Sequence, residues 1–167
     1  MRSVLFLLLA MISSASLAGE ASRLVQTARS DYVTKLGTEL ALKGHIPQAN
    51  FDCVASIPLT TYTSSISAFL GSKLKSEEIA VALAFYESPA GTKYTQHGIV
   101  QFYKLKSIPT EMTSPSIGES EMQQILAFSR TSAGAKMINR DFSREMALAA
   151  KAAEDKELRA CGYKGAL

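Results

Sequence analysis

The sequence predicts an all-α protein, a single compact domain of about six or seven helices. Apolar side chains recur at helical spacing through most of the chain, and no alternating run of β-branched residues interrupts them. Gly, Pro, Ser and Thr residues stand where such helices would begin and end. Two segments also repeat each other, as expected of a duplicated helix–bend–helix unit. The length of 167 residues suits one domain with its own core.

The first 18 residues have the pattern of a secretory signal peptide. Arg2 supplies the positive start, and the apolar run Val4–Ile12 is shorter than the roughly 20 residues that span a bilayer. Ser16 and Ala18 are the small residues that a signal peptidase reads. We expect cleavage near Ala18 and a mature domain over 19–167, in the periplasm or outside the cell. The alternative is an uncleaved N-terminal anchor.

Two cysteines, Cys53 and Cys161, fit an exported protein. An oxidising compartment favours pairing them, which would tie the C-terminal region to the early part of the domain. A redox-active thiol is the alternative, but neither residue belongs to a C-x-x-C pair. The formal net charge is +3 and falls to +2 without Arg2, too little to indicate nucleic-acid binding.

Three helices are predicted before residue 75. The first begins near Ser22 and ends at Gly44, a typical C-terminal stop. A short second helix begins at Pro47, and Pro58 either ends it or starts the third, which stops near 71–74. The apolar face of the first helix comprises Leu24, Val25, Ala28, Tyr32, Leu36 and Leu40.

The next helix is expected to be capped by Ser76 and to end near Tyr86. Ser88 followed by Pro89 is an N-cap signature, so the chain should bend there and continue as a helix to about Lys106.

A loop over Ser107–Gly118 follows, with two prolines and several hydroxyl residues. Ser116 and Glu119 form a candidate capping box for a helix ending near Ser129. Thr131 then occupies the place of Ser88, and one last helix runs to about 158.

The repeat pairs residues 78–93 with 121–136, an offset of 121 − 78 = 43 positions. The copies, near 76–106 and 119–158, share Glu, Leu-Ala-Phe, a hydroxyl residue, Ala-Gly and Lys in register. Leu83, Phe85, Leu126 and Phe128 are expected to anchor the core. We interpret the Ala-Gly pair as a close-packing device, since Gly lowers helix propensity by roughly 1 kcal/mol. The alternative is an anion site at the helix start, supported by Lys93 and Lys136.

The segment 77–93 (Glu-Glu-Ile-x-x-x-Leu-Ala-Phe-Tyr-x-Ser-Pro-Ala-Gly-x-Lys) resembles the signature of the bacterial family catalogued as domain of unknown function 2059. The resemblance implies a small, exported, helical domain and no particular activity. The second copy departs from the signature, with Ser129 for Tyr and Ser132 for Pro.

No residue pattern indicates catalysis, so we expect no enzyme activity, cofactor or metal. The two histidines, His45 and His97, stand in no nucleophile–base context. Metal-ligand spacings and phosphate-binding loops are absent from the sequence.

The leading hypothesis is a non-catalytic periplasmic protein that binds another envelope protein. Its most specific form is an immunity protein that neutralises a periplasm-acting toxin, such as a cell-wall amidase. The loop 107–118 would carry recognition. The alternative is a carrier or chaperone for an apolar ligand or an envelope protein. Four methionines that could line a pocket between helices point to it: Met112, Met122, Met137 and Met146.

Overall fold

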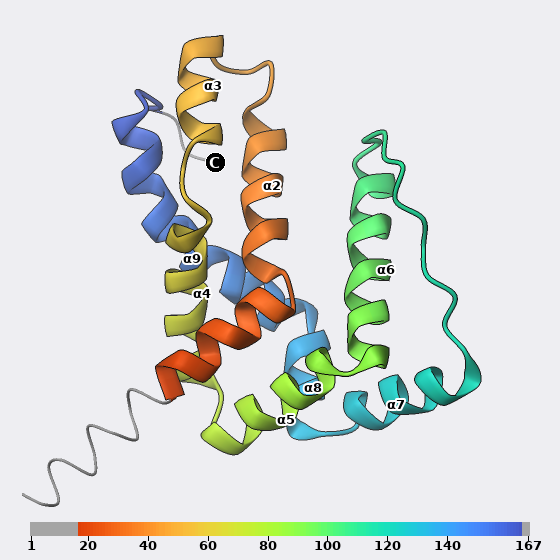
Figure 1. The fold of residues 1–167 in the computed structure, drawn as a ribbon. Helices are drawn as coiled ribbons and strands as arrows, with labels where there is room; N and C mark the ends of the chain where they lie inside the picture. Colours follow the sequence, from red (N-terminus) through yellow and green to blue (C-terminus); the bar gives the residue numbers. More distant parts are fainter. Residues whose placement is uncertain (1–16, 165–167) are drawn as a thin grey trace, which may run out of the picture.

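Helices are the regular elements of this protein throughout residues 17–164, the part that the computed structural model describes. Nine helices and no strands occur in that part, so the all-α prediction is confirmed there (Figure 1). The predicted signal peptide lies mostly outside it, because residues 1–16 are not described. The helices are 17–27, α2 (Ser30–Leu42), α3 (Gln48–Ala55), α4 (Leu59–Lys73), α5 (Ser76–Glu87), α6 (Pro89–Leu105), α7 (Glu119–Ser129), α8 (Ser132–Ile138) and α9 (Arg140–Ala160).

The helix count exceeds the prediction because two expected helices are each broken in two. The first breaks at Arg29, whose φ of 57° places it in the left-handed region and turns the chain before α2. The last breaks at Asn139, whose side chain accepts hydrogen bonds from the N–H groups of Asp141 and Phe142. Apolar spacing continues across both breaks, so periodicity alone does not reveal them.

Helix α4 is central to the half of the fold that the N-terminal and C-terminal helices form together. It packs against α2 on one side and α9 on the other. Two buried hydrogen bonds reinforce these contacts: Thr63 donates to Asp31 of α2 at 2.7 Å, and Tyr62 donates to Glu154 of α9 at 2.7 Å. All four side chains are buried, so each carboxylate receives a partner where water is scarce.

The bend in each copy of the repeat is built as predicted. Ser88 and Thr131 accept hydrogen bonds from the backbone N–H of Gly91 and Gly134, at 3.1 and 3.0 Å. A Cβ at Gly91 would lie 2.7 Å from the Tyr86 Cα and closer still to the Phe85 carbonyl oxygen. Gly134 is confined in the same way by the backbone of Phe128. These glycines are therefore close-packing positions, but the close approach is to the preceding helix of the same copy rather than between the two copies.

The two copies pack on each other reciprocally, as if related by a local twofold axis. Helix α5 contacts α8 while α7 contacts α6. Phe85 and the equivalent Phe128 stack on each other, with ring centroids 4.0 Å apart and planes 6° apart. The duplication thus produces one four-helix module, α5 to α8, rather than two separate units.

Two of the expected helix caps are wrong. Helix α5 has Lys75 rather than Ser76 as its N-cap, and α7 starts after Gly118 rather than Ser116. In both helices the third residue is a glutamate, and its side chain accepts a hydrogen bond from the backbone N–H of the N-cap residue. Glu78 accepts from the Lys75 N–H at 2.9 Å, and Glu121 from the Gly118 N–H at 2.6 Å.

One expected core anchor is also wrong. Leu83, Phe85 and Phe128 are buried, but Leu126 is 41% exposed. The equivalent helices differ in their surroundings. Helix α5 contacts α4 and is joined to helix 17–27 through an ion pair, whereas the close contacts of α7 are with α6 and α8. Equivalent residues of the repeat therefore need not share an environment.

Candidate functional site

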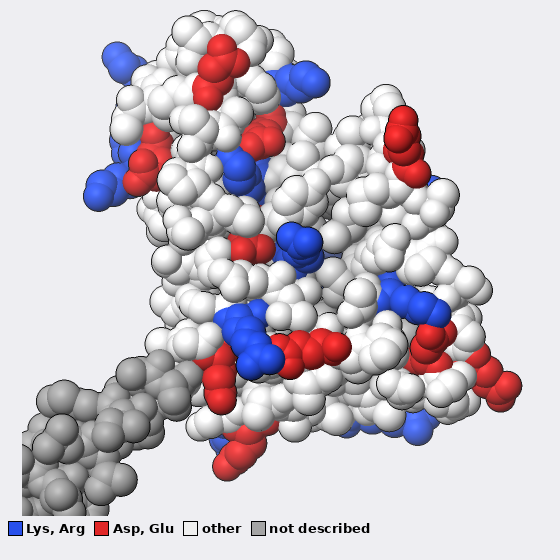
Figure 2. Space-filling view, viewed as in Figure 1, with Lys and Arg blue, Asp and Glu red and all other residues white. Residues whose placement is uncertain are grey.

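A groove of about 950 Å³ opens between α2, α6 and α9. Figure 1 shows α6 standing apart from α2, and Figure 2, in the same view, shows the molecule notched between the parts that carry them. Within the notch the surface is largely uncharged, whereas acidic and basic side chains are mixed over the rest of this face. The volume lies near the top of the range of about 300–1,000 Å³ that is typical of ligand pockets.

Each wall of the groove is one face of a helix. Residues of α2 that line it are Ser30, Val33, Thr34, Gly37, Thr38 and Ala41, at helical spacing. On α6, Tyr94, Gly98, Phe102 and Leu105 lie along the facing stripe. The face from α9 includes Arg144, Ala147, Leu148, Lys151 and Glu154. Tyr86 at the end of α5 and Met137 of α8 also line the groove, whose surface is mainly apolar.

The width of the groove depends on two glycines inside helices. Gly37 of α2 and Gly98 of α6 line opposite walls. A Cβ added at either position would meet nothing within 4 Å in the neighbouring described structure. Unlike Gly91 and Gly134, these glycines relieve no collision, although each weakens its helix by roughly 1 kcal/mol relative to Ala. Their effect on the fold is to leave room in the groove.

Apolar side chains are exposed on both lips of the groove. Leu105, at the end of α6, is 84% exposed, and Leu148 of α9 is 56% exposed. Burying such a leucine against a ligand contributes roughly 1.5–3 kcal/mol when the burial is complete. The lips therefore present surface that an apolar ligand would cover favourably.

Polar side chains also line the groove, and their partners differ. The Thr95 hydroxyl is buried and has no hydrogen-bond partner among the described residues. Glu154 is 3% exposed and accepts from Tyr62, which is mainly buried. Burial, followed by this hydrogen bond, raises the pKa of Tyr62, so Tyr62 remains a donor.

Two tyrosines join the α2 and α6 walls. The hydroxyl groups of Tyr32 and Tyr103 lie 2.6 Å apart, within hydrogen-bond distance. This hydrogen bond, with burial, raises the pKa of Tyr32 to about 12. Tyr32 therefore stays protonated over the physiological pH range, and the hydrogen bond links helices that belong to different halves of the fold.

Lys93 and Lys136, the candidate anion or partner contacts, lie in ion pairs between the two copies of the repeat. Lys136 pairs with Glu78 at 2.8 Å, and Lys93 pairs with Glu121. The Lys136 hydrogen bond, with Ser132 and Lys75, lowers the pKa of Glu78 to about 2. Lys93 likewise lowers the pKa of Glu121. An external anion would have to compete with these carboxylates.

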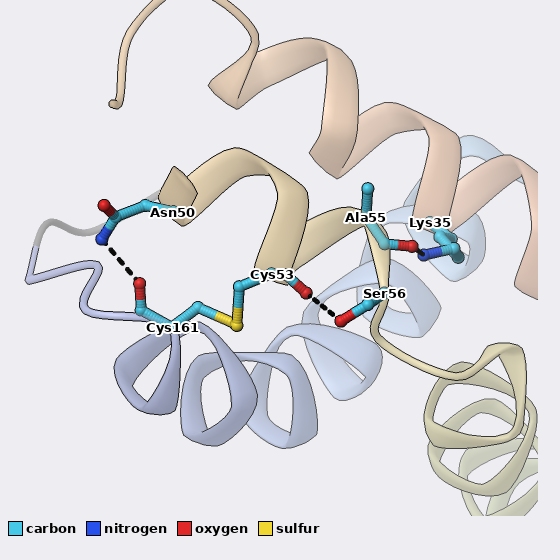
Figure 3. Close-up of a disulfide and its surroundings, with 6 residues drawn as sticks. All are labelled: Lys35, Asn50, Cys53, Ala55, Ser56 and Cys161. Carbon is cyan, nitrogen blue, oxygen red and sulfur yellow. Dashed lines mark hydrogen bonds between the residues drawn. A yellow bond between two sulfur atoms is a disulfide. The ribbon is translucent and has the colours of Figure 1, made fainter. Parts of the chain in front are cut away.

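The predicted disulfide is formed between Cys53 of α3 and Cys161, which follows α9 (Figure 3). Asn50 donates to the Cys161 carbonyl at 2.7 Å beside it. Lys35 of α2 donates to the carbonyls of Ala55 and Ile57 at 2.8 and 2.9 Å, which attaches α3 to α2. The cross-link therefore joins the end of the α9 wall to the segment following the α2 wall.

Of the methionines and histidines that the sequence analysis considered, some line the groove and others are exposed on the surface. Met137 and Met146 line the groove and pack against the core, while Met112 and Met122 are exposed. His97 lines the groove and His45 is exposed.

The loop 107–118 descends beside α6 to the start of α7 and is mostly exposed (Figure 1). Among residues 17–164, no group of three His, Cys, Asp or Glu side chains is placed to hold a metal ion.

The sequence did not reveal the groove itself. The α2 and α6 stripes contain glycine, alanine and threonine beside larger apolar residues, so they read as ordinary helix surface. The available signal was the pair of glycines inside strongly helical segments, at 37 and 98.

Comparison with known proteins gives no match: no family model, curated protein or solved structure corresponds to this chain. The resemblance of 77–93 to domain of unknown function 2059 stays an expectation. Within residues 17–164, none of the helices has the length and apolar character needed to cross a bilayer.

Proposed function

We propose that this protein is an exported carrier of an apolar ligand, which it holds in the groove between α2, α6 and α9. The observation that carries the proposal is the open, mainly apolar groove whose opposite walls contain Gly37 and Gly98. Alanine at these positions would strengthen both helices without a collision, and larger side chains would take up part of the groove. A binding role accounts for their absence.

The disulfide supports export, because such bonds persist in oxidising compartments. Together with the signal-peptide pattern of residues 1–18, it favours a periplasmic or secreted carrier. The protein-binding hypothesis, including an immunity protein, stays open as a proposal, and no contact of the described residues favours it over ligand binding.

The test is to fill the groove from each wall and measure binding of the neutral fluorescent probe N-phenylnaphthylamine. We expect the native protein to bind the probe, and Gly37→Leu and Gly98→Leu to weaken binding by tenfold or more. Gly71→Leu is the matched control. Gly71 also lies inside a helix, α4, and an added Cβ there meets no atom within 4 Å, but it does not line the groove.

All three variants should be as stable as the native protein or more stable, since leucine has the higher helix propensity. Native mass spectrometry of the exported protein provides a second readout, as a bound ligand adds mass. Equal probe binding by the native protein, both groove variants and the control would contradict the carrier role. Absence of probe binding by the native protein would also contradict it.

A further inference from the structure

The charges that line the groove restrict the chemistry of the ligand, given the carrier role proposed above. Its cationic lining residues, Arg144 and Lys151, both belong to α9. They lie on the same helix face as Leu148, at spacings of four and three residues. Positive charge and exposed apolar surface therefore occur together along one wall.

Arg144 is available for an external partner. It is exposed at the edge of the groove, and it takes part in no ion pair among residues 17–164. Its guanidinium group offers parallel N–H donors that match one carboxylate.

The acidic lining residue occupies a different environment. Glu154 is 3% exposed and already accepts a hydrogen bond from Tyr62. A cationic head group would have to lose its water to reach this carboxylate. An anionic head group can remain at the hydrated edge beside Arg144 while its tail occupies the groove.

We infer that the ligand is a single-chain amphiphile with one negative charge, a long-chain fatty-acid anion. Its carboxylate pairs with the Arg144 guanidinium group, and its chain lies between α2 and α6, past Gly37 and Gly98. Leu105 and Leu148 cover the part of the chain nearest the opening. Only the head-group assignment goes beyond the carrier role, which the groove supports independently.

The experiment compares dodecanoate with dodecanol, which has the same chain and no charge. Each is used below its aggregation concentration to displace N-phenylnaphthylamine from the native protein, Arg144→Gln and Arg140→Gln. Arg140 is the matched control, because it is an exposed arginine of α9 that does not line the groove. We expect Arg144→Gln to weaken dodecanoate binding roughly five- to tenfold, as for loss of a partly exposed charged contact of about 1 kcal/mol.

Dodecanol affinity should be the same in all three proteins, and Arg140→Gln should bind dodecanoate as the native protein does. If Arg144→Gln binds dodecanoate as tightly as the native protein does, the head-group assignment is wrong although the carrier role stands. If the Arg144 and Arg140 variants lose dodecanoate affinity equally, the effect is a non-specific charge effect and the head-group assignment is wrong. Binding of neither compound, with no binding of the probe, would overturn the carrier role as well.

Discussion

The close contact between Gly91 and the backbone of α5 predicts that Gly91→Ala will severely weaken the fold. Gly91 lies in the first turn of α6, directly against the end of α5. A Cβ there would lie 2.7 Å from the Tyr86 Cα and nearer still to the Phe85 carbonyl oxygen. Both obstacles are backbone atoms, so no change of rotamer can remove the collision. The bend between α5 and α6 would have to open.

The expected magnitude is the difference between two opposing effects. Replacing a helical glycine with alanine stabilises the helix by roughly 1 kcal/mol. Overpacking typically costs about 1–3 kcal/mol, and a backbone collision belongs at or above the upper end. Gly91→Ala should therefore lower the free energy of unfolding by at least about 2 kcal/mol. Gly98→Ala, seven residues along the same helix with no atom within 4 Å of the added Cβ, should raise it by up to about 1 kcal/mol.

Urea unfolding followed by circular dichroism measures both variants on one scale. A difference of about 3 kcal/mol separates their midpoints by at least about 1 M, given slopes of about 1–3 kcal/mol/M. Gly134→Ala should behave like Gly91→Ala, since its Cβ would meet the Phe128 backbone in the same way. If Gly91→Ala is as stable as Gly98→Ala, the bend does not require a glycine and the packing argument is wrong.

Three further outcomes follow from the cross-links of the fold. Tyr103→Phe should lower the pKa of Tyr32 from about 12 toward its ordinary value of 10, which tyrosinate absorbance would show. The variant should also release the probe faster in stopped-flow fluorescence. An unchanged pKa of Tyr32 would contradict the hydrogen bond between the two hydroxyl groups. Replacing Cys53 and Cys161 together with alanine should lower the free energy of unfolding by about 2–5 kcal/mol in urea titrations, and reductant should then have no further effect. The pKa of Glu78 is lowered from 4.5 to about 2, so its contribution to the stability of the fold is present above pH 4.5 and is lost as the pH falls through about 2. The difference in stability between the native protein and Glu78→Gln should therefore shrink between these pH values. A constant difference in thermal melts would contradict the prediction.

Helical periodicity was sufficient to predict the fold class but not every boundary. Ser88 was a recognisable cap because a proline follows it, and Thr131 was recognisable because it occupies the place of Ser88 in the second copy of the repeat. The break at Arg29 had no such signal, since a left-handed arginine is set by tertiary packing rather than by its own preference. Asn139, by contrast, was a readable N-cap inside an apparently continuous helix.

The candidate site was predictable only in its parts. The sequence suggested a pocket between helices and named four methionines for it. Met137 and Met146 do line the groove, whereas Met112 and Met122 are exposed and do not. The sequence also singled out Lys93 and Lys136 from the repeat, but could not show that each faces a glutamate of the other copy. Which helix faces converge depends on how α2, α6 and α9 cross, and local sequence patterns carry little of that information.

The glycines show how structural and functional signals can be separated in such a chain. Gly91 and Gly134 are required by the fold, because their missing side chains let two helices meet. Gly37 and Gly98 are required by nothing within the described fold, and alanine would serve the helices better. Natural sequences are expected to give up local stability chiefly where a site needs it. Gly19 and Gly71 are also helical glycines that relieve no collision, and they lie outside the groove. Gly37 and Gly98 differ from them because they face each other across one groove, so the groove is where a binding role explains two such positions together.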